Sequence, residues 1–218
     1  MTSVTLDRPW LSFDLGQEMQ VLSWALNRPG FVRARHILWR EVRNADLTED
    51  LDARAWLIAE LHRPGLPKAV AFLTSRDVTR HHRASASIGE DRADCLATVG
   101  LGNAERVGQR RDFAAQDWGT INIAIRLTQG LTQPGLIEAL SIATQARTAA
   151  ILDAGLALPG GLLATGTGTD CLAIAAPPGT CDHAGLHTAT GEVIGAAVYR
   201  ATLEGACVWL AEDRQPRR

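Results

Sequence analysis

The chain has little net charge and no long apolar run, and each shortage excludes a class of protein. Its formal net charge is -2, which does not indicate a basic protein that binds nucleic acid, so polyanionic partners are not expected. No run approaches the roughly 18 apolar residues of a membrane span. The first residues, MTSVTLDRPW, lack the basic-then-apolar order of a signal peptide. We therefore expect a cytoplasmic protein with neither nucleic-acid nor membrane partners.

Cysteine is also scarce, and the four cysteines are widely spaced. Cys95, Cys171, Cys181 and Cys207 form no CxxC pair. A zinc ribbon needs paired cysteines and a disulfide scaffold needs a dense cysteine framework, so neither is indicated. We expect free thiols and assign no metal or other cofactor.

What the chain does have is the composition of an ordinary globular domain. Its 218 residues are 46% hydrophobic and 21% charged. That length supports one sizeable hydrophobic core and does not require a second. The sequence therefore predicts a single domain over residues 1–218, and it leaves the oligomeric state open.

The order of the expected elements defines the fold class. Helical spacing and end signals predict helices within residues 47–67, 133–156 and 191–203. The basic stretch TRHHR at 79–83 is interpreted as a solvated turn, and the six tryptophans mainly as core. The strands do not alternate regularly with helices, so we expect an α+β layered fold with largely antiparallel or mixed sheet and about three main helices. The expected strands are SVTL, WLSFDL, QVLSWAL, RARHILWREV, KAVAFLTS, DCLATVGLG and TINIAIRLT.

Two glycine-rich loops are candidates for ligand binding. VGLGNAERVG has Glu105 where a dinucleotide fingerprint needs its third glycine, and no helix opens there. ATGTGTD, at 164–170, precedes a strand and lacks the GKS or GKT of a phosphate loop. It offers backbone N–H groups, threonine hydroxyls and the carboxyl group of Asp170. The alternative is a tight turn in which Asp170 binds local backbone amides.

The segment that follows carries further titratable groups. His183 and His187 are four residues apart, which suits metal binding on a helix, but Gly185 between them makes a helix unfavourable. Glu192 falls in the first turn of the third helix, where the helix dipole alone explains an acid. Two loops that each carry a titratable group could converge on one cleft, so we expect Asp170 and His187 to meet there.

These motifs together resemble one protein family. ATGTGTDCLAIAAPPG, HAGLHTATGEVIGAAVYRA, TVGLGN and GTINIAI occur in an order similar to that of the adenosylcobinamide amidohydrolase family of cobalamin salvage, from about Val70 to Leu203. The resemblance implies a corrinoid substrate. It also implies hydrolysis of the amide between the corrin propionyl side chain and aminopropanol, which yields adenosylcobyric acid and 1-amino-2-propanol.

Amide hydrolysis requires an activated nucleophile, a stabilised oxyanion and a protonated leaving amine. We expect Asp170 or Glu192 to act as base towards water and His187 to donate the proton. Thr169 as a covalent nucleophile is the alternative, and Asn122 is a candidate to position the amide unless it only binds neighbouring backbone. The substrate-binding candidates, which include the expected oxyanion donors of the glycine-rich turn, are Gly102, Asn103, Asn122, Gly166, Thr167 and Gly168.

Two other classes of function stay open. A corrinoid-binding protein without turnover would keep the same glycine-rich cradle. In addition, GTINIAIRLTQGLTQPGLIEAL resembles a stretch of the DmpA-type aminopeptidases. That likeness implies a layered αββα fold and a nucleophile generated by self-cleavage, which would split the chain.

Overall fold

The structure is a computed structural model that describes residues 2–43, 46–47, 50–109 and 119–213. The part of the chain that it describes contains three α-helices, an eight-stranded mixed sheet and a separate two-stranded pair. The helices are α1 (Ala53–Glu60), α2 (Gln133–Ala154) and α3 (Ala189–Asp213). The strands of the large sheet are β1 (Ser3–Asp7), β2 (Trp10–Ser23), β3 (Gly30–Glu41), β4 (Val70–Thr74), β5 (His81–Ile88), β6 (Asp91–Val99), β8 (Ile121–Leu127) and β10 (Cys171–Ala176). The small pair is β7 (Ala104–Glu105) and β9 (Gly166–Thr167).

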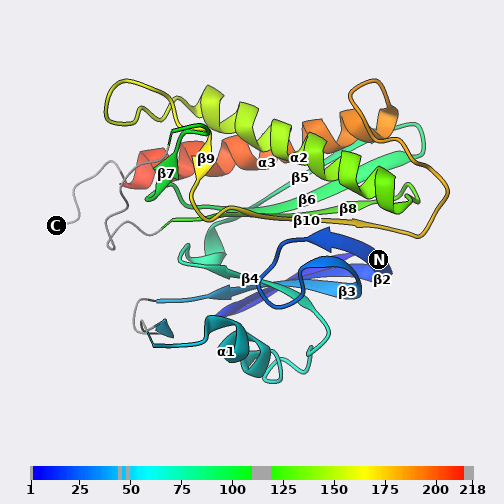
Figure 1. Ribbon diagram of the computed structural model, residues 1–218, viewed down its shortest axis with the longest axis horizontal. Helices are drawn as coiled ribbons and strands as arrows, with labels where there is room; N and C mark the ends of the chain where they lie inside the picture. Colours follow the sequence, from blue (N-terminus) through cyan, green and yellow to red (C-terminus); the bar gives the residue numbers. More distant parts are fainter. Residues whose placement is uncertain (1, 44–45, 48–49, 110–118, 214–218) are drawn as a thin grey trace.

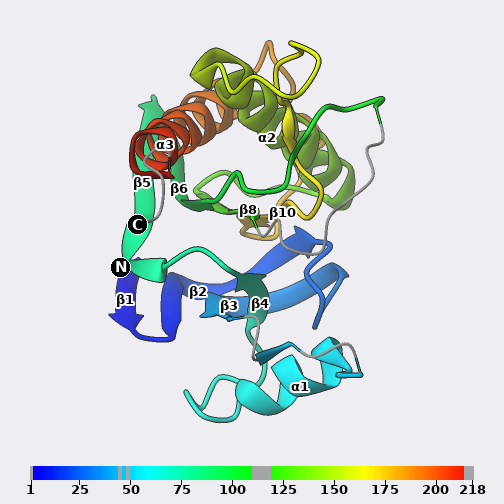
Figure 2. The same cartoon turned by 90° about the vertical axis from the view of Figure 1, so that its left-hand side faces the viewer.

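The large sheet forms two of the four layers of the molecule. Its strand order is β4-β3-β2-β10-β8-β6-β5, with β1 paired to β2. Figures 1 and 2 show that the half built from β10, β8, β6 and β5 lies over the half built from β1 to β4. Helices α2 and α3 cover the outer face of the first half, and α1 covers the outer face of the second. The expected α+β layered fold is confirmed, and the layers follow the order αββα.

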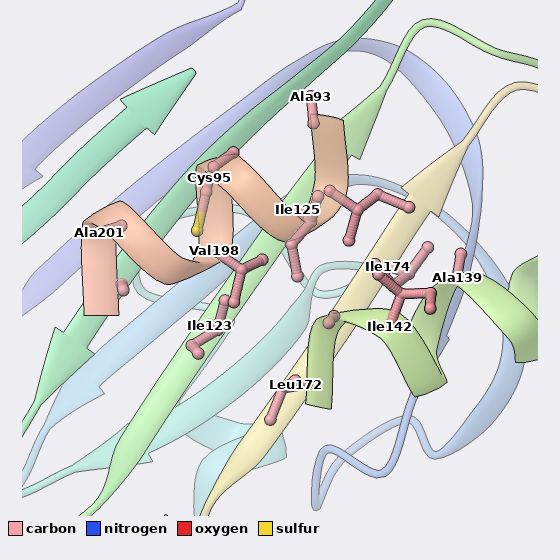
Figure 3. Close-up of a cluster of buried hydrophobic side chains, with 14 of the residues drawn as sticks. Ala93, Cys95, Ile123, Ile125, Ala139, Ile142, Leu172, Ile174, Val198 and Ala201 are labelled. Atoms are coloured by element: carbon pink, nitrogen blue, oxygen red, sulfur yellow. The ribbon is translucent and has the colours of Figure 1, made fainter. Parts of the chain in front are cut away.

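The core beneath α2 and α3 explains why the central strands are so apolar. Strands β8 and β10 are buried on both faces, so they read as almost continuous hydrophobic runs instead of alternating ones. Figure 3 shows the side chains that meet between this half of the sheet and the two helices. They include Ala93, Cys95, Ile123, Ile125, Ala139, Ile142, Leu172, Ile174, Val198 and Ala201.

The opposite face of β8 and β10 carries small residues, because the second half of the sheet packs there. Ala124 and Ala173 are fully buried against large side chains from β2, β3 and β4. Among these, Trp39 and Phe72 meet edge to face with ring centroids 5.1 Å apart. Small residues on one half and large ones on the other let the two halves approach closely.

Helix α1 is shorter than the expected segment 47–67. It begins after Asp52, whose side chain accepts hydrogen bonds from the Arg54 and Ala55 amides as an N-cap. Leu57 then packs in a third cluster on the outer face of β3 and β4. Leu47 lies outside the helix and lines a pocket instead.

Other elements differ from expectation in length or type. Two of the expected short strands form the single long strand β2, which is irregular in register between Asp14 and Met19. The basic stretch at 79–83 opens the edge strand β5 instead of forming only a turn. Helix α3 runs well beyond the expected end at Leu203. Its length and apolar composition would suit a membrane span, but in the fold it packs on α2, β5 and β6.

Candidate active site

A pocket of about 560 Å³ opens at one end of the two sheet halves. Strands β2, β3 and β4 end there, whereas β8 and β10 begin there. One wall comes from the N-terminal half of the sheet and is mainly apolar. Its apolar residues are Trp24, Ala25, Leu26, Val42, Leu47, Ala71, Phe72 and Leu73, and Thr74 and Ser75 are its polar members. The other wall is mostly polar and includes Asn103, Gly119, Thr120, Asn122, Gly168, Thr169, Asp170 and Cys171.

Asp170 orders the glycine-rich turn between β9 and β10. Its carboxylate accepts hydrogen bonds from the Thr167 amide at 3.1 and 3.2 Å, from the Thr167 hydroxyl and from the Ile121 amide at 3.3 Å. A nitrogen of the Arg147 guanidinium also contacts the carboxylate. The side chain is only 7% exposed. The geometry therefore matches the alternative in which Asp170 binds local backbone amides, since donors of the chain itself surround the carboxylate.

Arg147 reaches this carboxylate from helix α2. Its side chain is 13% exposed, and the same guanidinium donates to the Thr165 carbonyl at 3.1 Å. A Cβ on residue 166 would overlap the guanidinium, so the ion pair requires Gly166. Burial raises the pKa of the Asp170 carboxyl group, while the positive charge of Arg147 and the hydrogen bonds from Thr167 oppose the rise.

Thr169 presents its hydroxyl at the exposed surface of this turn. The hydroxyl donates to the Gly119 carbonyl at 2.9 Å and accepts from the Asn103 amide nitrogen at 3.2 Å. The backbone carbonyl of Thr169 accepts from the Thr120 hydroxyl at 2.8 Å. Asn103 is buried, and its side-chain oxygen lacks a hydrogen-bond partner within the described residues. Such an unpaired buried group is an exception that calls for an explanation, and a ligand site is one.

Asn122 joins the two halves of the sheet at the base of the pocket. Its side-chain nitrogen donates to the Leu73 carbonyl on β4 at 2.7 Å, and its oxygen lies 3.3 Å from the Thr120 hydroxyl, whose proton is directed mainly to the Thr169 carbonyl. The residue is 1% exposed. Of the two roles expected for Asn122, the geometry favours binding of neighbouring groups over positioning of a substrate.

The other expected substrate-binding residues occupy different places. Gly168 lines the pocket, but its amide donates to the Asn103 carbonyl at 3.3 Å. The Thr167 amide is engaged by Asp170, so these two amides are not aimed at an oxyanion as expected. Gly102 is exposed and is not a lining residue, although a Cβ on Gly119 would collide with its amide.

The expected meeting of Asp170 with His187 is wrong. Asp170 immediately precedes β10, whereas His187 and Glu192 follow the far end of that strand, where α3 begins (Figure 1). A strand of six residues separates the two ends by about 20 Å. His187 and Glu192 are exposed there, and Glu192 lies in the first turn of α3 as expected.

The same loop offers little support for a metal site. His183, like His187, is exposed, and Gly185 lies between them in a non-helical segment. Within the described ranges, no group of three or more His, Cys, Asp or Glu side chains is placed to hold a metal ion.

Sequence reasoning missed two features of the pocket. Arg147 sits in an unremarkable helical segment, and only the folded structure brings it to Asp170. The sequence predicts that Trp24 lies in the core, but its side chain is 46% exposed on the apolar wall of the pocket. Since both placements depend on contacts between distant segments, no local pattern in the sequence marks them.

The fold and the pocket define a four-layer αββα protein with a ligand-sized pocket between its two sheet halves. A family model described as adenosylcobinamide amidohydrolase (CbiZ) matches residues 2–214, so the chain belongs to that family. No curated protein matches the sequence. Among solved structures, the crystal structure of the PH0078 protein from Pyrococcus horikoshii OT3 is similar, with a TM-score of 0.46 and 11% sequence identity. That alignment covers 90% of this chain and 76% of the other.

Proposed function

We propose that the protein hydrolyses the amide that joins aminopropanol to the corrin side chain of adenosylcobinamide. The products are adenosylcobyric acid and 1-amino-2-propanol. The observation that carries the proposal is the family match over residues 2–214, which includes every segment that lines the pocket. The pocket also supports the proposal. Its volume suits the aminopropanol end of the substrate, and its polar wall is rich in hydrogen-bonding groups.

In this proposal the Thr169 hydroxyl contacts the scissile carbonyl. Thr169 is exposed to the pocket, and the Asn103 amide holds its hydroxyl oxygen in place. The hydroxyl proton, which lies on the Gly119 carbonyl at 2.9 Å, turns from that carbonyl to the ligand when the substrate binds. A hydroxyl aimed at the carbonyl oxygen stabilises the negative charge that develops when water attacks the carbon. Asn103 acts through Thr169 as a positioning residue.

The direct test is turnover of adenosylcobinamide by the purified protein. Mass spectrometry is used to detect adenosylcobyric acid and free 1-amino-2-propanol, with a mock purification from the same host as control. Equal amounts of both products support the proposal, and parallel samples with EDTA report whether a metal ion takes part. Intact adenosylcobinamide after prolonged incubation contradicts the proposed reaction.

A corrinoid-binding protein without turnover is the second candidate. One observation favours it: within the described lining of the pocket Asp170 is the single carboxylate, it is occupied by donors of the chain, and no histidine is present. Saturable binding of cobinamide with no release of aminopropanol would favour this candidate over the hydrolase.

A further inference from the structure

The mouth of the pocket carries two large apolar side chains that the fold leaves in solvent. Trp24 is 46% exposed and Leu26 is 42% exposed, and both line the pocket directly after the end of β2. An exposed apolar residue by itself is ordinary. Here the two lie on the same wall of a cavity whose other wall is polar, which is the arrangement of a ligand site.

The segment that carries these side chains is fixed in place. The Ser23 hydroxyl accepts from the Ala25 amide at 3.0 Å and donates at 2.8 Å to a carbonyl of β10. The Trp24 indole N–H donates to the Asp170 carbonyl at 2.8 Å. The buried Asn27 side chain binds backbone groups at the start of β4 at 2.9 and 3.0 Å. A rigid indole loses little entropy when a ligand covers it, so the surface is organised before binding.

The size of the pocket limits how a corrinoid can enter it. A cavity of about 560 Å³ falls within the usual range for small ligands. The corrin macrocycle with its adenosyl group is much larger than such a ligand. Only the side chain that ends in aminopropanol fits inside, which leaves the macrocycle at the mouth of the pocket, where Trp24 and Leu26 lie.

We propose that Trp24 and Leu26 form a platform that binds the apolar surface of the corrin macrocycle while the amide side chain extends towards Thr169. The proposal rests on the proposed function, from which it takes the corrinoid. The indole hydrogen bond to Asp170 joins the platform to the turn that carries Thr169.

The test compares Trp24→Ala, Leu26→Ala and Trp24→Phe with the wild type. Calorimetry gives the Kd for cobinamide, and steady-state assays give KM and kcat for adenosylcobinamide. Trp24→Ala is expected to raise Kd and KM by at least roughly tenfold, as removal of a central aromatic contact does. The kcat value should change little, because the contact is the same in the ground state and the transition state. Leu26→Ala should act in the same direction, and Trp24→Phe should stay near the wild type because it keeps a ring.

Ile137→Ala is the matched control for Leu26→Ala. Ile137 is an aliphatic residue on α2 with 56% exposure, and it is not among the residues that line the pocket. This variant should bind cobinamide like the wild type, so a loss confined to the platform variants supports the proposal.

Three outcomes overturn the platform. The first is an unchanged Kd in both alanine variants, and the second is an equal loss of cobinamide affinity in Trp24→Phe and Trp24→Ala. The third is no cobinamide binding by the wild type. The second outcome would assign the effect to the hydrogen bond with Asp170 instead of the ring. Turnover by the wild type with an unchanged Kd in the variants removes the platform and keeps the proposed reaction. Weakened binding in the variants of a protein without turnover removes the reaction and supports the platform.

Discussion

At the residue scale, the ion pair of Asp170 and Arg147 decides how the glycine-rich turn is interpreted. Both side chains are almost closed to solvent, at 7% and 13% exposure. The sequence marked Asp170 as a candidate base, and the fold instead surrounds it with donors. Asp170 therefore shapes the surface that holds Thr169, and its replacement should first affect the stability of the fold.

We expect Asp170→Asn to lower the free energy of unfolding by about 3 kcal/mol, because it leaves the buried Arg147 guanidinium without its counter-charge. Urea denaturation measures this change. The double variant Arg147→Met with Asp170→Asn removes both charges and should recover part of the loss. A single variant as stable as the wild type would contradict the structural role of the pair.

Cys171 is the thiol that lines the pocket, and its protonation state follows from its burial. Burial raises the pKa of Cys171 to about 12. The folded protein therefore keeps the neutral thiol at physiological pH and loses the proton only when the pH approaches that value. Iodoacetamide at pH 8, followed by peptide mapping, should modify the exposed Cys207 well before Cys171. Equal labelling of the two cysteines in the folded protein would show that Cys171 is a reactive thiolate.

At the element scale, the irregular part of β2 is held by a charged contact across to β3. The Asp14 carboxylate accepts two hydrogen bonds from Arg35, each at 2.9 Å, and one from the Gly16 amide at 2.8 Å. These interactions lower the pKa of Asp14 to about 2, and the contact with Arg35 is the main cause. The carboxylate thus stabilises the register of β2 against β3 whenever it is ionised.

The pH dependence follows from the sign of that shift. A depressed pKa in the folded state gives stability that is present above the ordinary aspartate pKa of about 4. This stability is lost as the pH falls towards 2. We expect Asp14→Asn to reduce the free energy of unfolding at pH 7 and to change it little near pH 2. Urea titrations at several pH values measure the difference, and a deficit independent of pH would contradict the assignment.

The elements differ in how far the sequence predicted them. The apolar runs of β8 and β10 and the capped helix α2 were recognisable because their signals are local. Tertiary pairing places Arg147 against Asp170 and the Asn122 side chain against β4. These two placements could not be recognised from the sequence. The prediction that Asp170 and His187 converge was wrong because the sequence does not show at which end of the sheet each loop lies.

At the scale of the whole molecule, the layers follow the order αββα (Figure 1), and the family match assigns the chain to the adenosylcobinamide amidohydrolases. The likeness to DmpA-type aminopeptidases raised self-cleavage as a separate possibility. In the proposed mechanism Thr169 acts through its hydroxyl in an intact chain. We expect the intact mass of active protein to match a single 23.4 kDa species. A stable fragment that begins at Thr169 would instead indicate a nucleophile generated by cleavage.

The location of the site is the central claim, and one comparison tests it most directly. The value of kcat/KM for adenosylcobinamide is measured for Thr169→Val and His187→Ala, with Thr169→Ser and Thr144→Val as controls. The Thr144 hydroxyl donates to the Leu140 carbonyl of its own helix, its one hydrogen bond among the described residues, so its valine variant controls for loss of a hydroxyl. We expect Thr169→Val to lose about 10²- to 10³-fold, the usual cost of one oxyanion donor, and Thr169→Ser to retain most activity. His187→Ala should match the wild type, because His187 is exposed at the far end of β10. Loss of turnover in His187→Ala with full activity in Thr169→Val would contradict the account and place the chemistry at the start of α3.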